Sequence, residues 1–407
     1  MKEWKTYRLG DIITISSGFP YKGEFIGKGN NYLLGMGCVS FKETFLKSGL
    51  RQYSGDAPER YIAHPGDIVL ATRQQSDNLP ILGMPAIIPQ AYNGYKMIIG
   101  ANLYKVQNES EFSNAYIYWL MKSPAYVHHI KSCQTGTTVR MITKANIEDF
   151  TFKAPEKSER DKIASFLWNI EEKIAINRQI NDNLEQQAQA IYKSWFVDFE
   201  PFKDGNFVES ELGLIPEGWE VRDIYKYTDV IYGAPYKSSL FSENKEGYPL
   251  IRIRDLKSFA PQFYTQEILP QTEYIIAGDV VAGMDAEFTP YIWQGEKGVL
   301  NQRCCKFKGQ YPWVSNYYLL NLLKPELEYV QSYKTGTTVS HLGKADIDRF
   351  KVITPPESIV KTFSVIVNSL LEQKIKSAYE IRNLTSTRDS LLPKLMSGEL
   401  KINEIDC

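Results

Sequence analysis

The sequence is a tandem duplication, and this feature restricts the fold more than any other because both halves must build the same unit. The recurring segments, each with its second copy, are Gly-Phe-Pro-Tyr-Lys 18–22 with Gly-Ala-Pro-Tyr-Lys 233–237, Gly-Asp-Ile-Val 66–69 with Gly-Asp-Val-Val 278–281, Thr-Gly-Thr-Thr-Val 135–139 with 335–339, Lys-Ala-x-Ile-x-x-Phe 144–150 with 344–350, and Pro-Glu 155–156 with 356–357. The order of these anchors is the same in both halves, while the sequence between them differs freely. We interpret the repeat as a unit that keeps its scaffold and varies one surface.

Within each unit, the first part has the pattern of short strands, turns and one helix. Residues 12–15 are β-branched, and the apolar runs 67–70 and 279–281 follow Gly-containing turns, so we predict strands there. The apolar spacing of 113–121 and 314–323 predicts a helix in each copy. Each unit is therefore expected to contain an α+β globular domain.

The second part of each unit is a long helix. Residues 157–195 contain no Pro or Gly, and apolar side chains recur there at alternating spacings of four and three, which is typical of a coiled-coil seam. The predicted seam is Ile163, Leu167, Ile170, Ile174, Asn177, Asn181, Leu184, Ala188, Ile191 and Trp195. The second helix, from 357 to about 391, places Phe363, Ile366, Leu370, Leu384 and Leu391 on one face. Neither stripe can be buried alone, so we predict that the helices pack antiparallel.

These elements predict an α+β fold in which two globular α/β domains are separated by two long antiparallel coiled-coil helices. The predicted boundaries are a first globular domain at 1–155, a first helix at 156–200, a second globular domain at 201–356 and a second helix at 357–407. We expect the globular domains to be recognition modules, because they carry the sequence variation.

Composition excludes several classes of protein. No apolar run approaches the ~20 residues of a membrane span, and the N-terminal residues have no apolar core of a secretory leader. Five scattered cysteines without Cys-x-x-Cys spacing favour a reducing, cytoplasmic setting. The net charge of -1 is unevenly spread, with 17 basic and 12 acidic residues in 1–155 but 17 and 20 in 201–356. Any contact with nucleic acid must therefore come from local basic faces.

The duplicated order of these motifs resembles the specificity subunits of type I restriction-modification enzymes. The segments 283–288, 295–297 and 300–303 look like one version of a second target recognition domain of that family. Residues 190–199 look like its central conserved region, and 392–400 look like its distal one. The resemblance covers the whole chain, although Arg-Gln-Gln-Ser-Asp at 73–77 departs from the version of the family seen at 284–288.

The resemblance implies a DNA-recognition subunit that reads a bipartite, asymmetric site, with one half read by each globular domain. It implies that the helices dock two modification (methyltransferase) subunits, and that restriction and translocase subunits join the complex. S-adenosylmethionine, ATP and Mg²⁺ are then expected in those partner subunits, with no cofactor in this chain. The alternative is an interaction scaffold, in which a coiled coil carries two protein- or glycan-binding domains.

The residue patterns predict no catalytic site. There is no Gly-x-x-x-x-Gly-Lys-Ser/Thr loop for ATP and no Asn/Asp-Pro-Pro-aromatic motif of an adenine methyltransferase. The four histidines lack metal-ligand spacing, so no metal site is predicted. We therefore expect a non-catalytic subunit.

Candidate DNA contacts lie where groups suited to base edges or phosphates follow strands and turns. Arginine pairs with guanine, and glutamine or asparagine pairs with adenine, while hydroxyls and lysines suit phosphates. The candidates in the first copy are Tyr21, Lys22, Arg73, Gln74, Gln75, Asn78, Thr137, Thr138 and Arg140. Those in the second are Tyr236, Lys237, Arg252, Arg254, Asp285, Glu287, Tyr291, Arg303, Thr337, Thr338 and His341. We expect 73–78 to lie on a loop, and Arg252 and Arg254 to share one strand face. Each set is also compatible with ordinary turns, core tyrosines and solvated charges.

The aromatic run Tyr192, Trp195, Phe196 and Phe199 has two interpretations. It can pack the end of the helix onto its neighbour, or it can form an exposed patch that binds a methyltransferase subunit. The resemblance favours the partner-binding interpretation, and both can hold together.

Overall fold

The structure is a computed structural model that describes residues 4–74, 80–334 and 341–405. Its contacts divide the chain into two compact units. The first unit consists of Met1–Glu172 together with Leu384–Cys407, and the second is Lys173–Asn383. Helices and strands occur in both units, which confirms the predicted α+β class. Within the described residues, none of the helices combines the length and apolar character needed to cross a membrane.

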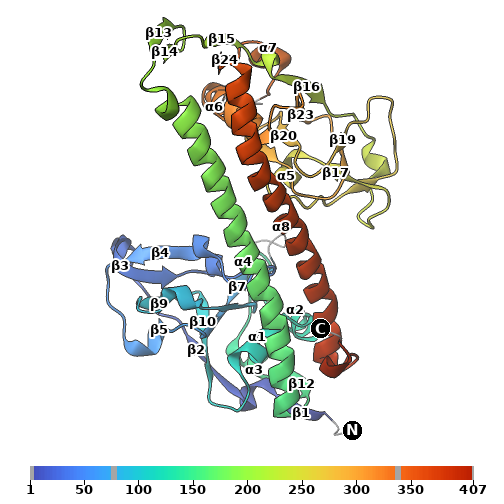
Figure 1. The fold of residues 1–407 in the computed structure, drawn as a ribbon. Helices are drawn as coiled ribbons and strands as arrows, with labels where there is room; N and C mark the ends of the chain where they lie inside the picture. The colour runs from blue at the N-terminus through green and yellow to red at the C-terminus, as the bar shows by residue number, and fades with distance from the viewer. Residues whose placement is uncertain (1–3, 75–79, 335–340, 406–407) are drawn as a thin grey trace. The chain divides into compact units, whose positions relative to one another are not determined.

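The first unit contains two four-stranded sheets and two strand pairs (Figure 1). Its first sheet has the order β2 (Ile13–Ser17), β10 (Leu103–Asn108), β6 (Ile68–Ala71), β8 (Pro85–Ile87), and its second has the order β4 (Leu50–Tyr53), β3 (Ile26–Leu34), β9 (Met97–Ile99), β5 (Ile62–Ala63). The pairs are β1 (Lys5–Arg8) with β12 (Thr151–Ala154), and β7 (Arg73–Gln74) with β11 (Arg140–Met141). The predicted strands at 12–15 and 67–70 are confirmed as β2 and β6.

The second unit repeats this strand order. Its first sheet is β16 (Thr228–Tyr232), β23 (Cys304–Gly309), β20 (Val280–Gly283), β21 (Pro290–Ile292), and its second is β18 (Tyr264–Thr265), β17 (Tyr248–Ile251), β22 (Gly298–Leu300), β19 (Tyr274–Ile275). The pair β15 (Glu220–Asp223) with β24 (Lys351–Thr354) corresponds to β1 with β12, whereas the hairpin of β13 (Phe207–Ser210) and β14 (Gly213–Pro216) has no counterpart among the described strands of the first unit. Each second sheet has one parallel pair, β3 with β9 and β17 with β22. The duplication read from the sequence is therefore a duplication of topology.

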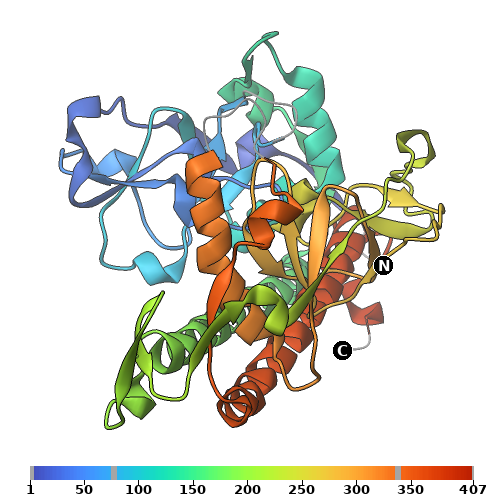
Figure 2. The ribbon, with the colours of Figure 1, turned by 90° about the horizontal axis from the view of Figure 1, so that it is seen from above.

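Most of the short helices correspond between the units. The first unit has α1 (Asn114–Lys122) and α2 (Pro124–Cys133) after β10, where the second has the single helix α6 (Asn316–Lys334) after β23, and α3 (Lys144–Glu148) corresponds to α7 (Lys344–Ile347). The helix α5 (Ile253–Leu256) follows β17, and a 3-10 turn, Met36–Cys38, stands at the equivalent place after β3. Ser123 ends α1, and its hydroxyl caps α2 by accepting from Tyr126 N–H. Pro124 follows in the first turn of α2, where a proline is well suited. In the second unit, α6 continues through Pro325 and packs on β20, β21 and β23 (Figure 2, where α6 is orange).

Two long helices, α4 (Lys157–Phe196) and α8 (Glu357–Ser397), contribute to both units and run antiparallel within each (Figure 1). In the second unit, Asn177 near the middle of α4 donates to Glu380 at 3.0 Å, whereas Phe196 at its end packs on Phe363 near the start of α8. In the first unit, Glu171 of α4 forms an ion pair with Arg388 near the end of α8. The antiparallel packing predicted from the unpaired stripes is confirmed.

The predicted seam of α4 is buried over most of its length. Its members from Ile163 to Ala188 are all buried, including both asparagines, while Ile191 and Trp195 are partly buried. The Asn177 side chain is satisfied by Glu380, but Asn181 Oδ1 is a buried acceptor without a partner among the described residues. A buried asparagine weakens such a seam but fixes its register.

The predicted face of α8 is confirmed at Phe363, which is buried, and is wrong at Ile366, which is 40% exposed. The buried residues around them are Val360, Val367 and Leu371, while the predicted Leu370 is half-buried. Because apolar side chains stand at three successive positions from Val365 to Val367, spacing alone cannot select the buried one. The helix also continues beyond the predicted end near 391, since Leu392, Leu395 and Met396 join the core of the first unit.

Candidate nucleic-acid interface

In the first unit, backbone hydrogen bonds join three segments that are far apart in the sequence. Thr72 N–H donates to Asn102 O at 3.2 Å, and Ile142 N–H donates to Thr72 O at 3.3 Å. Next to these bonds, β7 pairs with β11 so that Arg73 lies opposite Met141. The three segments are the end of β6, the turn before β10 and the strand after the Thr-Gly-Thr-Thr-Val motif. We call this arrangement the backbone frame of the unit.

The second unit builds the same backbone frame at the equivalent residues. Met284 N–H donates to Arg303 O at 2.8 Å, and Leu342 N–H donates to Met284 O at 2.7 Å. An antiparallel bridge then places Asp285 opposite His341. The duplication therefore preserves not only strand order but also a specific junction of three segments.

Each backbone frame holds three side-chain positions, which we call the display positions. They are Arg73, Asn102 and Met141 in the first unit, and Asp285, Arg303 and His341 in the second. Two of the three are exposed in each unit, and Asn102 and Asp285 are half-buried. All three residue types differ between the copies, although the hydrogen bonds beneath them are the same. A surface built in this way can change what it contacts without changing its scaffold.

The display positions of the second unit form one electrostatic cluster. Asp285 Oδ2 forms an ion pair with Arg303 at 2.9 Å, and Asp285 Oδ1 lies 2.7 Å from His341 Nδ1. One half-buried carboxylate therefore holds two exposed side chains through its two oxygens. Arg303 and His341, predicted separately from the sequence, are brought together by Asp285.

The loop after Asp285 is fixed by hydrogen bonds. Gln331 accepts from Phe288 N–H and donates to Ala286 O, both at 2.9 Å, and Ala286 adopts a left-handed conformation with φ 62°. Glu287 accepts from the Tyr291 hydroxyl at 2.9 Å, and burial together with this bond raises the pKa of Tyr291 to about 12. Glu287 and Tyr291 are thus oriented by one another, and Tyr291 remains a donor at neutral pH.

In the first unit the expected loop at 73–78 begins as a strand. Arg73 and Gln74 form β7 because their backbone groups pair with β11, so the loop expectation is wrong for these two residues. Arg73 is exposed, whereas Gln74 is buried and accepts from Leu82 N–H at 3.3 Å. Arg140 pairs with Gln74 across the strands and is half-buried. The structure brings these three predicted residues together, but it exposes only Arg73 fully.

The threonines of the first copy lie on the turn that leads into β11. Thr137 and Thr138 are exposed, and Gly136 adopts φ 91°, where a Cβ would meet Val139 O at 2.2 Å. Only glycine fits this turn, which explains Gly136 in the first copy of the motif. Four other predicted residues, Gln75, Asn78, Thr337 and Thr338, lie outside the described residues.

The duplicated Tyr-Lys pairs combine a packed ring with an exposed amine. Tyr236 is buried and donates to Thr272 Oγ1 at 2.9 Å, while Tyr21 is half-buried and packs edge-on against Tyr53. Lys22 and Lys237 are exposed. The alternative of a core tyrosine followed by a solvated lysine describes Tyr236, and only the lysines present charge to solvent.

Arg252 and Arg254 do not share a strand face. β17 ends at Ile251, and the chain turns into α5, because Asp255 accepts from the Arg252 backbone N–H at 3.1 Å. The Arg252 guanidinium forms an ion pair with Asp255 at 3.3 Å and lies 4.3 Å from the centre of the Phe263 ring. Arg254, inside α5, is exposed. The strand expectation is wrong because a local carboxylate caps a helix there.

The aromatic run at the end of α4 packs inside the second unit. Phe196 is buried against Phe363 and Trp219, and Tyr192 lies against Tyr318. Trp195 and Phe199, which are half-buried, also belong to this cluster. An exposed patch is therefore wrong for Phe196, and the alternative, in which the helix end packs onto its neighbours, describes the structure. Alternating helix spacing could not distinguish these cases because both require clustered aromatics.

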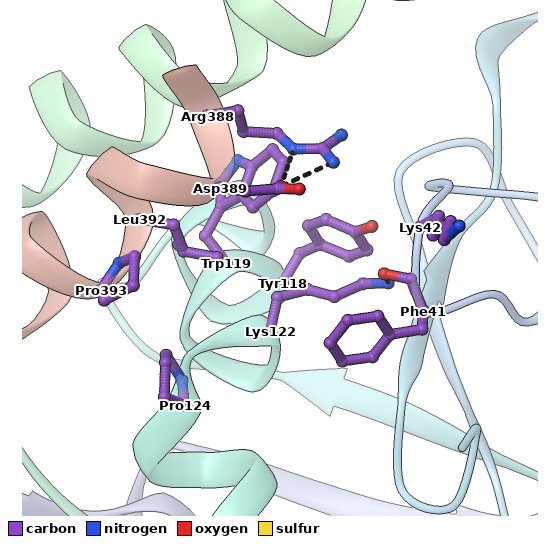
Figure 3. Close-up of a pocket in the computed structure, with 10 residues that line it drawn as sticks. All are labelled: Phe41, Lys42, Tyr118, Trp119, Lys122, Pro124, Arg388, Asp389, Leu392 and Pro393. Atoms are coloured by element: carbon purple, nitrogen blue, oxygen red, sulfur yellow. Dashed lines mark hydrogen bonds and ion pairs between the residues drawn. The ribbon is translucent and has the colours of Figure 1, made fainter. Parts of the chain in front are cut away.

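A separate hollow of about 180 Å³ in the first unit is lined by residues of α1 and α8, by Phe41 and Lys42, and by Pro124 of α2 (Figure 3). The amine of Lys122 lies among its aromatic residues and donates to the carbonyl oxygens of Ser40 and Phe41. Arg388 forms ion pairs with Glu171 and Asp389. Because Lys122 and Arg388 are both engaged by the protein itself, we assign no ligand to this hollow.

Lys122 should nevertheless make stability depend on pH. Burial lowers the pKa of Lys122 to about 7, against about 10.4 in an unfolded chain. Between these values the unfolded chain binds more protons, so this residue raises the free energy of unfolding as pH rises, by up to about 1.4 kcal/mol per pH unit. The Lys122→Met variant should lack this rise in denaturant titrations between pH 7 and 8.5.

The difference in stability between wild type and Lys122→Met reports on Lys122 alone, because other buried groups are the same in both proteins. Burial raises the pKa of Cys38 to about 12, so this thiol changes the pH dependence of stability only at higher pH. Lys131→Met, at an exposed lysine of α2, is the matched control and should keep the wild-type dependence. Parallel curves for wild type and Lys122→Met would contradict the assignment.

Two display positions, Asn102 and Met141, were missed by the sequence reasoning. Neither lies in a run of polar residues, and Met141 is an apolar side chain that is 42% exposed. The sequence does contain a signal for them. Arg73 aligns with Asp285 at a shift of 212 residues between the copies, and shifts of 201 and 200 then align Asn102 with Arg303 and Met141 with His341. That alignment requires knowing which three segments meet.

Comparisons of the sequence and of the structure with known proteins all find specificity proteins of type I restriction-modification systems. The family model described as the type I restriction modification DNA specificity domain matches residues 1–186 and 216–379. The chain is 24% identical to the type I restriction enzyme MjaIX specificity subunit of Methanocaldococcus jannaschii, over 99% of this chain and 95% of that protein. It is 24% identical to the HindI specificity subunit of Haemophilus influenzae, over 98% and 100% of the two chains. A crystal structure of a type I restriction-modification S subunit from M. genitalium has a TM-score of 0.55 at 13% identity, covering 97% and 96%, which shows a shared fold.

Proposed function

Because this chain belongs to the family of type I restriction-modification DNA specificity domains and its family role is DNA sequence recognition, we propose that it reads a bipartite, asymmetric DNA site. Each unit reads one half of the site through its display positions and the loops beside them. The observation that carries this proposal is the duplicated backbone frame, which is the same in both units while all three display residues differ. Backbone contacts fix register on DNA, whereas variable side chains at base edges specify sequence.

The candidate contacts divide by chemistry. Arg73, Arg140 and Arg303 suit base edges, as does Glu287, which can accept from cytosine. Asp285 uses both of its oxygens on Arg303 and His341. The exposed lysines Lys22 and Lys237 and the hydroxyls of the two Thr-Gly-Thr-Thr-Val motifs suit phosphates. The alternative of a protein- or glycan-binding scaffold has no comparable support, since the matching family is one of DNA specificity domains.

We further propose that the chain is non-catalytic and serves two modification subunits and the restriction and translocase subunits. S-adenosylmethionine, ATP and Mg²⁺ then belong to those partners. Two docking faces are expected because the duplication creates two quasi-equivalent surfaces, and repeated surfaces bind repeated partners. Because Phe196 is part of the core, we expect the partner subunits to bind the solvent-facing sides of α4 and α8. On α8, Val365 and Tyr379 are exposed.

The test is reconstitution with a type I methyltransferase subunit from the same organism. The mixture should methylate DNA at a motif of two specific blocks around unread bases, and its mass should correspond to one specificity chain with two methyltransferases. Each component alone, at the same concentration, is the control and should leave DNA unmethylated. Methylation without a sequence motif, or a stable one-to-one complex at excess methyltransferase, would overturn the proposal.

A further inference from the structure

The display positions of the second unit differ from a phosphate-binding site in their charge balance. Asp285 and Glu287 contribute two carboxylates beside the single guanidinium of Arg303 and the imidazole of His341. Lys334, which donates to His341 O at 2.6 Å, is ion-paired with Asp346. Contact with DNA phosphates depends on an excess of cations. Here the two carboxylates balance both basic side chains when the imidazole is charged, and outnumber the single guanidinium when it is neutral. The cluster therefore has no excess of positive charge to attract a phosphate, whereas it can accept a neutral base edge.

The Arg303 side chain is exposed yet directed by its partner. Its ion pair with Asp285 uses one terminal nitrogen, at 2.9 Å, and a guanidinium has five N–H groups arranged in a planar fork. The backbone of Arg303 is fixed as well, because its carbonyl accepts from Met284 N–H at 2.8 Å. A fork that is held at one end and displayed at the other is suited to two acceptors in one plane. In the major groove, guanine offers this pair through O6 and N7.

We propose that Asp285 is a positioning residue that holds Arg303 against a guanine in the half-site read by the second unit, an inference that rests on the proposed function. Asp285 also fixes the His341 ring through Nδ1, so the opposite nitrogen, Nε2, is directed toward the neighbouring nucleotide. The half-site of the second unit therefore contains at least one guanine read in the major groove. Without the carboxylate, the arginine keeps its charge but loses its direction.

The first unit achieves its reading differently at the equivalent positions. Arg73 occupies the position of Asp285, and Asn102 and Met141 occupy those of Arg303 and His341. Its guanidinium thus comes from the strand β7 itself, and no carboxylate stands at the display positions of that unit. The two half-sites must differ, because the hydrogen-bonding groups at equivalent places differ.

The experiment uses the full chain in complex with its methyltransferase, after the methylated motif has been mapped. Each guanine of the second block is replaced in turn by 7-deazaguanine, which removes N7 but keeps base pairing, and binding is measured by competition. One replacement should weaken wild-type binding about 10-fold, since each bidentate pair provides roughly 5- to 150-fold discrimination. The Arg303→Ala variant should bind the modified and unmodified duplexes equally.

Variants of Asp285 test the positioning role. Asp285→Ala should lose most of the discrimination against 7-deazaguanine although Arg303 is present, and Asp285→Asn, which keeps one oxygen acceptor, should recover part of it. Discrimination at the first block is the internal control for folding and should be unchanged in every variant. Arg349→Ala, at an exposed arginine of the same unit outside the display positions, is the matched control and should bind like wild type.

The outcomes separate this inference from the proposed function. A second block without guanine overturns the inference, as does a uniform loss of affinity by Arg303→Ala on all duplexes with a weaker salt dependence, which would indicate a phosphate contact. In both cases the bipartite reading stands. A wild-type complex without any sequence preference overturns the proposed function and the inference with it.

Discussion

Exchanging residues 1–155 for those of a relative should change one block of the methylated DNA motif completely and leave the other block unchanged. The reason is that the backbone frame of each unit is complete within its own globular part, so the identity of its three display residues does not depend on the other copy. The measurement is methylation mapping of genomic DNA from cells that carry the whole system with either the parental or the exchanged chain.

The structure sharpens the design of this exchange. Leu392 and Leu395, near the end of α8, are buried in the core of the first unit, so a graft that stops at residue 155 must keep the contacts made with them. A graft that also carries 384–407 from the same relative is the matched control for folding. The reciprocal exchange of 201–356 should alter the other block. A motif in which both blocks change together, or neither does, would show that the reading is not modular.

Replacing Arg388 with Met should lower the free energy of unfolding of the first unit by about 3–5 kcal/mol. Arg388 and Glu171 form an ion pair in which both side chains are less than one-tenth exposed. Removing the guanidinium leaves the Glu171 carboxylate buried without its partner, and such a charge is costly because water cannot reach it. Denaturant unfolding of the full chain, followed by fluorescence of the aromatic residues, provides the measurement.

The double variant Glu171→Met with Arg388→Met should recover most of this loss, because both charges are then gone and apolar side chains fill the space. Lys157→Met breaks an exposed pair with Asp161 on the same helix, 3.0 Å apart, and should cost no more than about 0.5 kcal/mol. If Arg388→Met loses as little stability as Lys157→Met, or if the double variant is as unstable as the single one, then the unpaired Glu171 carboxylate is not the cause of the loss.

The sequence predicted the parts of the fold that repeat or alternate. The duplicated anchors gave two α+β units, and the four-and-three spacing gave the buried face of α4 from Ile163 to Ala188. It failed where several side chains of one kind compete. Ile366 was expected in the seam, but Val367 is buried instead, and Phe196 was favoured as a docking residue, but it is part of the core. In these cases tertiary packing selects among candidates that local periodicity treats as equal.

The candidate site could be predicted only in part, for a related reason. Arg73, Asp285, Arg303 and His341 stood out because their groups suit base edges, and the structure brings three of them together. Asn102 and Met141 have no such signal, since their importance comes from hydrogen bonds between segments 30 or more residues apart. Arg252 was misplaced because its partner Asp255 turns the chain into a helix, and a single carboxylate outweighed the alternation that suggested a strand.

The first unit is built from two separate segments of the chain, and this has a consequence for biosynthesis. This unit joins residues near the start of the sequence to Leu384–Cys407, whereas the second unit is one uninterrupted segment, Lys173–Asn383. A ribosome releases residues in order, so the second unit can fold completely while the first still lacks Leu395 and the guanidinium that neutralises Glu171. The part of the protein that is synthesised first is therefore the last to mature. Until Leu392, Leu395 and Met396 at the end of α8 emerge, the apolar surface of the first unit that they cover stays exposed to chaperones and proteases.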